Sequence, residues 1–257
     1  MDELINSGLV SKQIGNFVLI LLRISILMKM LPIFSSQNIP AQYKIAFSVA
    51  LAVLITPLVD FKLDGKEELV VTIVKEVVLA MMLGVAARLV FFAADMAGQL
   101  MSNGMSLSIA TSFDPEFGQS AEVARFLGVI VTLLFFIMDI HHDLIAAIVK
   151  SFEVLPPGQI KLNPSMVHTI FSGSKVFTLS LKLAAPVMVG MVVANLLLGL
   201  LYKAAPQINI MFVSFPIFLF VGLILMMSTL PIFFKVIAGQ FNQLKDVLYE
   251  TLLLARP

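Results

Sequence analysis

Apolar runs long enough to cross a bilayer fill most of this chain. A hydrocarbon core about 30 Å thick takes about 20 helical residues. The sequence offers six such runs, at 14–34, 41–58, 69–97, 121–140, 167–202 and 206–234. Hydrophobic residues make up 59% of the chain and charged residues only 13%, which leaves too little polar surface to cover a soluble globule. The sequence therefore predicts an all-α, polytopic integral membrane protein with about six long helices.

Proline interrupts two of these runs. Pro186 stands in the middle of run 167–202, and Pro216 stands in run 206–234. A proline removes a backbone donor and kinks a helix, and in lipid the freed carbonyl needs a partner from another helix or from water. We therefore expect kinked helices that pack in a larger assembly.

Charged side chains also fall inside the runs, where contact with lipid would be costly. We expect all of them to face protein, water or the membrane interface. The set is Arg23, Lys29, Lys75, Glu76, Arg88, Asp95, Lys175 and Lys182. Arg88 and Asp95 stand seven residues apart, so a helix places them on one face. Two interpretations stay open for them. One is a structural ion pair or interfacial snorkelling; the other is a water path or a polar seam against partner subunits, and the seam would also include Gln99.

The chain lacks the motifs of familiar enzymes. His141 and His142 are adjacent, but neighbouring side chains on a helix point about 100° apart, so they would not easily share one metal ion. The sequence has no HExxH, Gly-x-Ser-x-Gly or GxxxxGK[ST] pattern and no Cys. Its net charge of +1 gives no general attraction to nucleic acid. We expect neither an enzyme nor a bound metal or other cofactor.

Small and polar residues separate two apolar runs at 98–118, GQLMSNGMSLSIATSFDPEFG. Gly98 and Gly104 permit a close approach of helices, as small residues do in membrane interfaces. Met101 and Met105 are four residues apart, so on a helix they would share one face. The first half of this stretch therefore predicts a close-packing helical or re-entrant segment.

The second half of the stretch ends in a forced turn. Pro115 drives Asp114 away from helical backbone, and Phe113 and Phe117 give the turn an apolar rim. Non-helical backbone at membrane depth survives only when it is buried in protein or lies beside water. From the residues alone, a plain surface loop and a plug in a pore both remain open.

Three segments resemble, in order and spacing, the FliR/SctT family of type III export-gate proteins. They are AARLVFFAADMAGQLMSNGMSLSIATSFDP at 86–115, DIHHDLIAAIVKSFEVLPPG at 139–158, and LAAPVMVGMVVANLLLGLLYKAAPQINIMFVSFPIFLFVGL at 183–223. Each motif is modest alone, but three in order are specific, and the resemblance covers nearly the whole chain. It favours the flagellar branch of the family over the virulence branch.

The resemblance implies a structural channel subunit that conducts unfolded export substrates across the bacterial inner membrane at the flagellar basal body. It implies FliP and FliQ homologues and an FlhB-like export switch protein as partners, besides membrane lipids, in a helical assembly raised partly out of the lipid plane. Residues 1–165 resemble a FliP-like portion and residues 166–257 a FliQ-like helical hairpin. The loop near 106–117 resembles the plug of the family. The candidate gate and plug residues are Met105, Phe113, Asp114, Pro115 and Phe117. A secondary transporter of a small solute is the alternative, since broken helices and intramembrane charges fit that class too.

Overall fold

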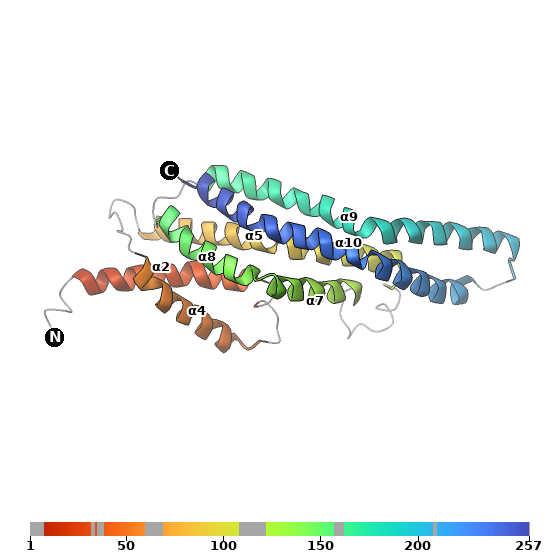
Figure 1. The fold of residues 1–257 in the computed structure, drawn as a ribbon, viewed down its shortest axis with the longest axis horizontal. Coiled ribbons are helices and arrows are strands. Elements are labelled where there is room, and N and C mark those ends of the chain that lie inside the picture. Colours follow the sequence, from red (N-terminus) through yellow and green to blue (C-terminus); the bar gives the residue numbers. More distant parts are fainter. Residues whose placement is uncertain are drawn as a thin grey trace. The chain divides into compact units, whose positions relative to one another are not determined.

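The computed structural model describes residues 8–31, 34, 39–59, 69–107, 122–156, 162–207 and 210–256. Within these ranges the chain forms helices and no strand. The α-helices, labelled in Figure 1, are α2 (Gly8–Met30), α4 (Ala41–Ile55), α5 (Leu69–Gly104), α7 (Glu122–Ile137), α8 (Ile140–Val154), α9 (Leu162–Ala204) and α10 (Ile210–Leu254). A 3-10 turn, η1 (Thr56–Leu58), follows α4. The all-α class predicted from the sequence is confirmed, with seven α-helices in the described part rather than about six.

The additional helix is α8, which follows α7 after a bend of 68°. Asp139 stands at the bend with a left-handed backbone (φ 56°), where α7 has ended and α8 begins. The buried residues of α8 recur at helical spacing: Ile140, Leu144, Ala147, Ile148, Ser151 and Phe152. This helix is amphipathic, and a search for continuous apolar runs misses it because its other face is polar.

The last helix also exceeds its apolar run. The sequence predicts a run that ends at Phe234, whereas α10 continues to Leu254. The added turns carry charged residues but keep a buried stripe, formed by Ile237, Phe241, Leu244, Leu248 and Leu252. The helix continues because burying one face stabilises it whether or not the opposite face is apolar.

Three helices are long and apolar enough to cross a membrane, over Val70–Gly104, Ser165–Ala204 and Phe212–Leu254. If the bent pair α7 and α8 crosses as one span, the described residues supply up to four. These spans agree with the predicted polytopic membrane protein.

The chain divides into two compact units that interleave along the sequence. Unit 1 comprises Met1–Leu89, Asp139–Gly173 and Gln243–Pro257, and unit 2 comprises Val90–Met138 and Ser174–Asn242. Both units contain part of the pair α9 and α10, which run in opposite directions as a hairpin (Figure 1). The division at residue 165 that the family resemblance implies does not coincide with either unit and stays a prediction.

A buried ion pair lies at the centre of unit 1. Arg23 of α2 donates through Nε and Nη2 to the two carboxylate oxygens of Glu76 on α5, each at 2.8 Å. Neither side chain is exposed to solvent. Two parallel bonds between a planar guanidinium and a carboxylate form the strongest side-chain pairing that proteins use. The expectation that these two in-span charges face protein is confirmed.

Helix α8 completes the surroundings of Arg23. Nη1 donates to Ser151 Oγ at 2.8 Å, and Nη2 also lies 3.3 Å from the carbonyl oxygen of Leu155. The ring of Phe152 lies beneath the guanidinium, with its centroid 3.9 Å from Cζ. One side chain therefore links α2, α5 and α8. The carboxylate of Glu76 balances its positive charge, and Ser151 and the carbonyl of Leu155 accept its other hydrogen bonds.

Unit 2 has an apolar centre instead. Phe91, Phe135 and Phe241, from α5, α7 and α10, pack with ring centroids 5.8 to 6.0 Å apart and planes tilted by 57° to 65°. Such tilted and edge-to-face pairs are favoured by the charge distribution of aromatic rings. These rings join three helices without any charged group.

Substituting Glu76 by Ala should destabilise the protein strongly, because Arg23 would stay buried without its carboxylate. Removing one partner of a buried pair typically costs about 3–5 kcal/mol. Thermal melting of the detergent-purified protein measures the loss. Glu122→Ala, in the exposed first turn of α7, is the matched control and should barely move the midpoint. Equal midpoints for the two variants would show that the pair does not support unit 1.

Candidate gate site

The candidate gate site is the C-terminal end of α5 together with the helices that pack on it in unit 2. Helix α5 continues through Gly98 to Gly104, so the first part of the stretch 98–118 is helical. It ends in a hydrogen-bonded cap. The N–H of Ser106 donates to the carbonyl of Asn103, and the N–H of Leu107 donates to that of Ser102, both at 3.1 Å. This pair of bonds is a Schellman motif, and it turns the chain directly before the candidate plug segment.

Ser106 occupies the left-handed position of this cap, with φ 58°. Glycine is the usual residue there because it has no Cβ. A residue with a side chain pays roughly 1 kcal/mol or more for the same backbone. The stop of α5 is therefore held by its hydrogen bonds and packing and not by an intrinsic preference of the sequence.

Two glycines bring other helices into close contact with α5. A Cβ added to Gly98 would lie 2.7 Å from the backbone nitrogen of Ala124 on α7, and one added to Gly222 of α10 would lie 2.6 Å from Cε of Met105. Real Cβ atoms essentially never approach other heavy atoms so closely. The absent side chains therefore set the spacing of α5 from both helices.

Gly104 plays a lesser part in this packing. A Cβ there would lie 3.8 Å from the side chain of Met191 on α9, an ordinary van der Waals separation. The sequence predicts a close helix contact at both Gly98 and Gly104. The structure places Gly98 in such a contact, whereas Gly104 has room for a methyl group.

Met105 is fully buried, and its side chain lies over Gly222. Met101, one turn earlier, is buried as well. In this structure both methionines pack within unit 2, and Met105 joins α5 to α10. A role of Met105 in a gate therefore stays a prediction, now with a defined neighbour.

Sequence reasoning missed two glycines in close contacts of the hairpin formed by α9 and α10, namely Gly190 and Gly222. A Cβ added to Gly190 of α9 would lie 3.3 Å from Cδ2 of Leu225 on α10. Neither Gly190 nor Gly222 was singled out, although the rule that small residues mark close helix contacts applies to both. A search for glycines inside the long apolar runs would have found them.

The three polar residues of α5 that the sequence assigns to a possible seam lie in different units. Gln99 Nε2 donates to Asp95 Oδ2 at 2.9 Å, and both side chains are exposed in unit 2. Arg88 is half-buried on the part of α5 that belongs to unit 1. Asp95 is thus hydrogen-bonded to Gln99 on its own helix, and the proposed seam against partner subunits stays a prediction.

Pro186 lies inside the continuous helix α9 and Pro216 inside α10, so neither ends its helix, and kinks at these positions remain predicted. Four candidate plug residues lie outside the described residues, namely Phe113, Asp114, Pro115 and Phe117.

The adjacent histidines converge more than helix geometry predicts. The ring centroids of His141 and His142 are 4.1 Å apart, and both rings lie with Asp139 in a group whose ligand atoms are within 4.8 Å of one another. Asp139 has a left-handed backbone directly before α8, which begins at Ile140 and contains both histidines. Asp139 and His142 are exposed at this helix end, and we assign the group no function.

Gly98→Ala should destabilise the protein, because the added methyl would collide with the backbone of Ala124. Overpacking of this kind typically costs about 1–3 kcal/mol, measured as a lower melting temperature in detergent. Gly104→Ala is the matched control, and it should be neutral or slightly stabilising because alanine is the better helix former. Equal melting temperatures for the two variants would contradict the close contact between α5 and α7.

Ser106→Gly should stabilise the protein by about 1 kcal/mol, because glycine adopts the left-handed backbone without penalty. Asn103→Gly, three residues earlier and helical, should do the opposite by about 0.5–1 kcal/mol. The same melting assay reads both changes. If both substitutions shifted the melting temperature in the same direction, the left-handed cap at the end of α5 would be contradicted.

Comparison with known proteins finds similarity over most of the chain. Residues 14–244 match the model of the family described as bacterial export proteins, family 1. The flagellar biosynthetic protein FliR of Pectobacterium carotovorum is 32% identical over 241 residues, which cover 90% of both chains. FliR of Caulobacter vibrioides is 30% identical over 89% of this chain and 94% of its own, and FliR of Escherichia coli is 30% identical over 90% and 91%.

These similarities extend over nearly the full length of this chain and of each relative, so they concern the whole chain and not one motif. The helices described above are apolar enough for the membrane that such a protein occupies. The chain therefore belongs to the bacterial export proteins, family 1, the FliR/SctT family, and is a membrane component of the flagellar export apparatus.

Proposed function

We propose that this chain is a channel subunit of the flagellar type III export gate and conducts unfolded substrates across the bacterial inner membrane. One observation carries the proposal beyond family membership. Helix α5 ends in a hydrogen-bonded cap at Ser106, and the buried Met105 packs on Gly222, so the candidate plug segment starts from an apolar contact between α5 and α10. An apolar contact of this kind can hold a segment in place and still repack when the segment moves.

The chemistry of the stretch suits a pore for unfolded chains. Such a pore must stop ions while it remains closed, yet accept any side chain when it opens. Apolar constrictions block ions by dewetting, and they demand no specific hydrogen bonds from a passing substrate. Phe113 and Phe117 would form the closing tip, and methionines such as Met105 would adapt to it because their side chains are flexible.

The surface of the hairpin supports a role inside an assembly. Only 28% of the most apolar stretch of α9 and 22% of that of α10 are buried within the chain. Lys175 and Lys182 are exposed on α9, seven residues apart and therefore on one face. Two ammonium groups on one helix face would be costly in lipid. We therefore propose that partner subunits or water cover this face, with FliP and FliQ homologues and an FlhB-like protein as the partners, in a complex raised partly out of the lipid plane.

The Phe113→Ala, Phe117→Ala double variant should raise ion leakage through the complete gate, because the closing tip would lose both rings. The complex is purified through a tag on this chain and its conductance is measured in planar bilayers. Phe220→Ala removes a ring that is 67% exposed on α10 and serves as the control with unchanged conductance.

Two outcomes would contradict the proposal. Unchanged conductance in the double variant would remove the plug role. A tagged chain that purifies without other helical subunits and transports a solute alone in liposomes would favour the secondary transporter instead.

A further inference from the structure

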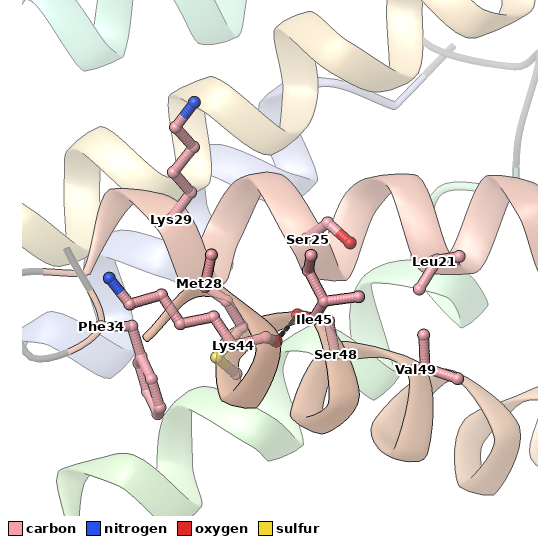
Figure 2. Close-up of a pocket in the computed structure, with 10 residues that line it drawn as sticks. Leu21, Ser25, Met28, Lys29, Phe34, Lys44, Ile45, Ser48 and Val49 are labelled. Carbon is pink, nitrogen blue, oxygen red and sulfur yellow. Dashed lines mark hydrogen bonds between the residues drawn. The ribbon is translucent and has the colours of Figure 1, made fainter. Parts of the chain in front are cut away.

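An apolar groove lies between α2 and α4 in unit 1 (Figure 2). Its volume is about 570 Å³, within the range of roughly 300–1,000 Å³ typical of small-molecule sites. Leu21 and Met28 of α2 and Ile45 and Val49 of α4 form its walls. Phe34 stands at one end, where its ring stacks on Phe47 with centroids 5.5 Å apart.

The groove is a product of two helix faces. On α2 the lining residues stand at 21, 25, 28 and 29, and on α4 at 41, 44, 45, 48 and 49; both series have the spacing of a single face. The groove is open to its surroundings, since Ile45 is 64% exposed. An open apolar groove of this kind suits a flexible hydrocarbon chain, because its apolar walls contact such a chain along its length and require no specific hydrogen-bond partner from it.

Two lysines give one end of the groove a positive charge. Lys29 lies in the last turn of α2, and Lys44 lies in the first turn of α4. These helix ends are neighbours in the chain, joined through residues 31–40. In Figure 2, Lys44 extends past Phe34 at this end of the groove, and Lys29 starts at the same end but points away from α4. None of the described residues that line the groove is acidic.

The remaining polar groups of the groove are neutral. The hydroxyl of Ser48 donates to the carbonyl of Lys44 at 2.9 Å, so it is satisfied inside α4. Ser25 is the other lining hydroxyl. The groove therefore combines a long apolar wall with a cationic end, which is the complement of an acyl chain that carries an anionic headgroup.

We propose that this groove binds an anionic phospholipid, with an acyl chain between α2 and α4 and the phosphate at Lys29 and Lys44. Lysines at the membrane surface attract anionic lipids by an amount that corresponds to roughly fivefold in affinity each. The two lysines together should therefore favour an anionic over a zwitterionic lipid by about 25-fold. This site is independent of the channel role, because it uses none of the gate residues.

A photoreactive lipid tests the proposal directly. The full-length chain, with any subunits that purify with it, is reconstituted in phosphatidylcholine vesicles that contain a trace of phosphatidylglycerol with a diazirine in one acyl chain. Labelled peptides are identified by mass spectrometry after illumination. We expect labelling of α2 and α4 at the groove, competed by unlabelled phosphatidylglycerol. The same diazirine on phosphatidylcholine should label these peptides far less.

Three variants separate charge from shape. Lys29→Gln with Lys44→Gln should reduce labelling by phosphatidylglycerol to the level of phosphatidylcholine. Ser25→Phe should fill the groove and abolish labelling by both probes while both lysines stay in place. Lys203→Gln removes an exposed lysine in the last turn of α9, outside the groove, and should change nothing. Co-purification of the same subunits and an unchanged melting temperature show that each variant is folded.

Three results would overturn the proposal. The first is equal labelling by the two lipids. The second is undiminished labelling by phosphatidylglycerol in the double lysine variant. The third is no lipid labelling at all, with Lys29 or Lys44 instead cross-linked by a carbodiimide to a carboxylate of another subunit, which would make the occupant a protein.

Discussion

The guanidinium of Arg23 is the group on which unit 1 depends. Moving an ion of this kind out of water carries a penalty of several kcal/mol, which is offset only by good geometry and full hydrogen bonding. Glu76, Ser151, the carbonyl of Leu155 and the ring of Phe152 provide both. Helices α2, α5 and α8 can therefore meet in one register only, because a shift of any of them would leave a buried charge without its partner. The ion pair is therefore evidence that the arrangement of these three helices is specified. It is weaker evidence that the protein is highly stable.

Unit 2 is specified by shape. Its aromatic cluster and its glycine contacts contain no charge, and the closest approaches depend on side chains that are absent at Gly98, Gly190 and Gly222. An apolar contact such as Met105 over Gly222 can loosen and repack at modest cost, because no buried charge or hydrogen bond is exposed when it opens. A moving part of a gate is therefore more easily accommodated in packing of this kind than around the Arg23 pair.

The exposed apolar surfaces of α4, α9 and α10 belong to a protein that does not function alone in water. Single exposed apolar residues are ordinary, but the large share on these helices requires lipid or other subunits. Charge distinguishes the two settings. Lys175 and Lys182, well inside the apolar helix α9, are unsuited to lipid tails, whereas Lys29 and Lys44 lie near the ends of α2 and α4. The two proposals follow this difference: partner subunits or water at the α9 face, and a lipid headgroup at the end of the groove.

The sequence by itself determined the helical membrane class, the approximate spans and the family, because hydropathy and ordered motifs are local properties of the chain. It also marked Arg23, Glu76 and Gly98 as residues that need special surroundings. It missed α8 and the last turns of α10, since an amphipathic helix is stabilised by the surface that it packs against and not by its own mean hydropathy. Only the tertiary structure paired Arg23 with Glu76 across 53 residues and set Met105 on Gly222, because such partners are chosen by three-dimensional packing. The groove between α2 and α4 has the same origin: each helix carries half of it, and neither half is a site alone.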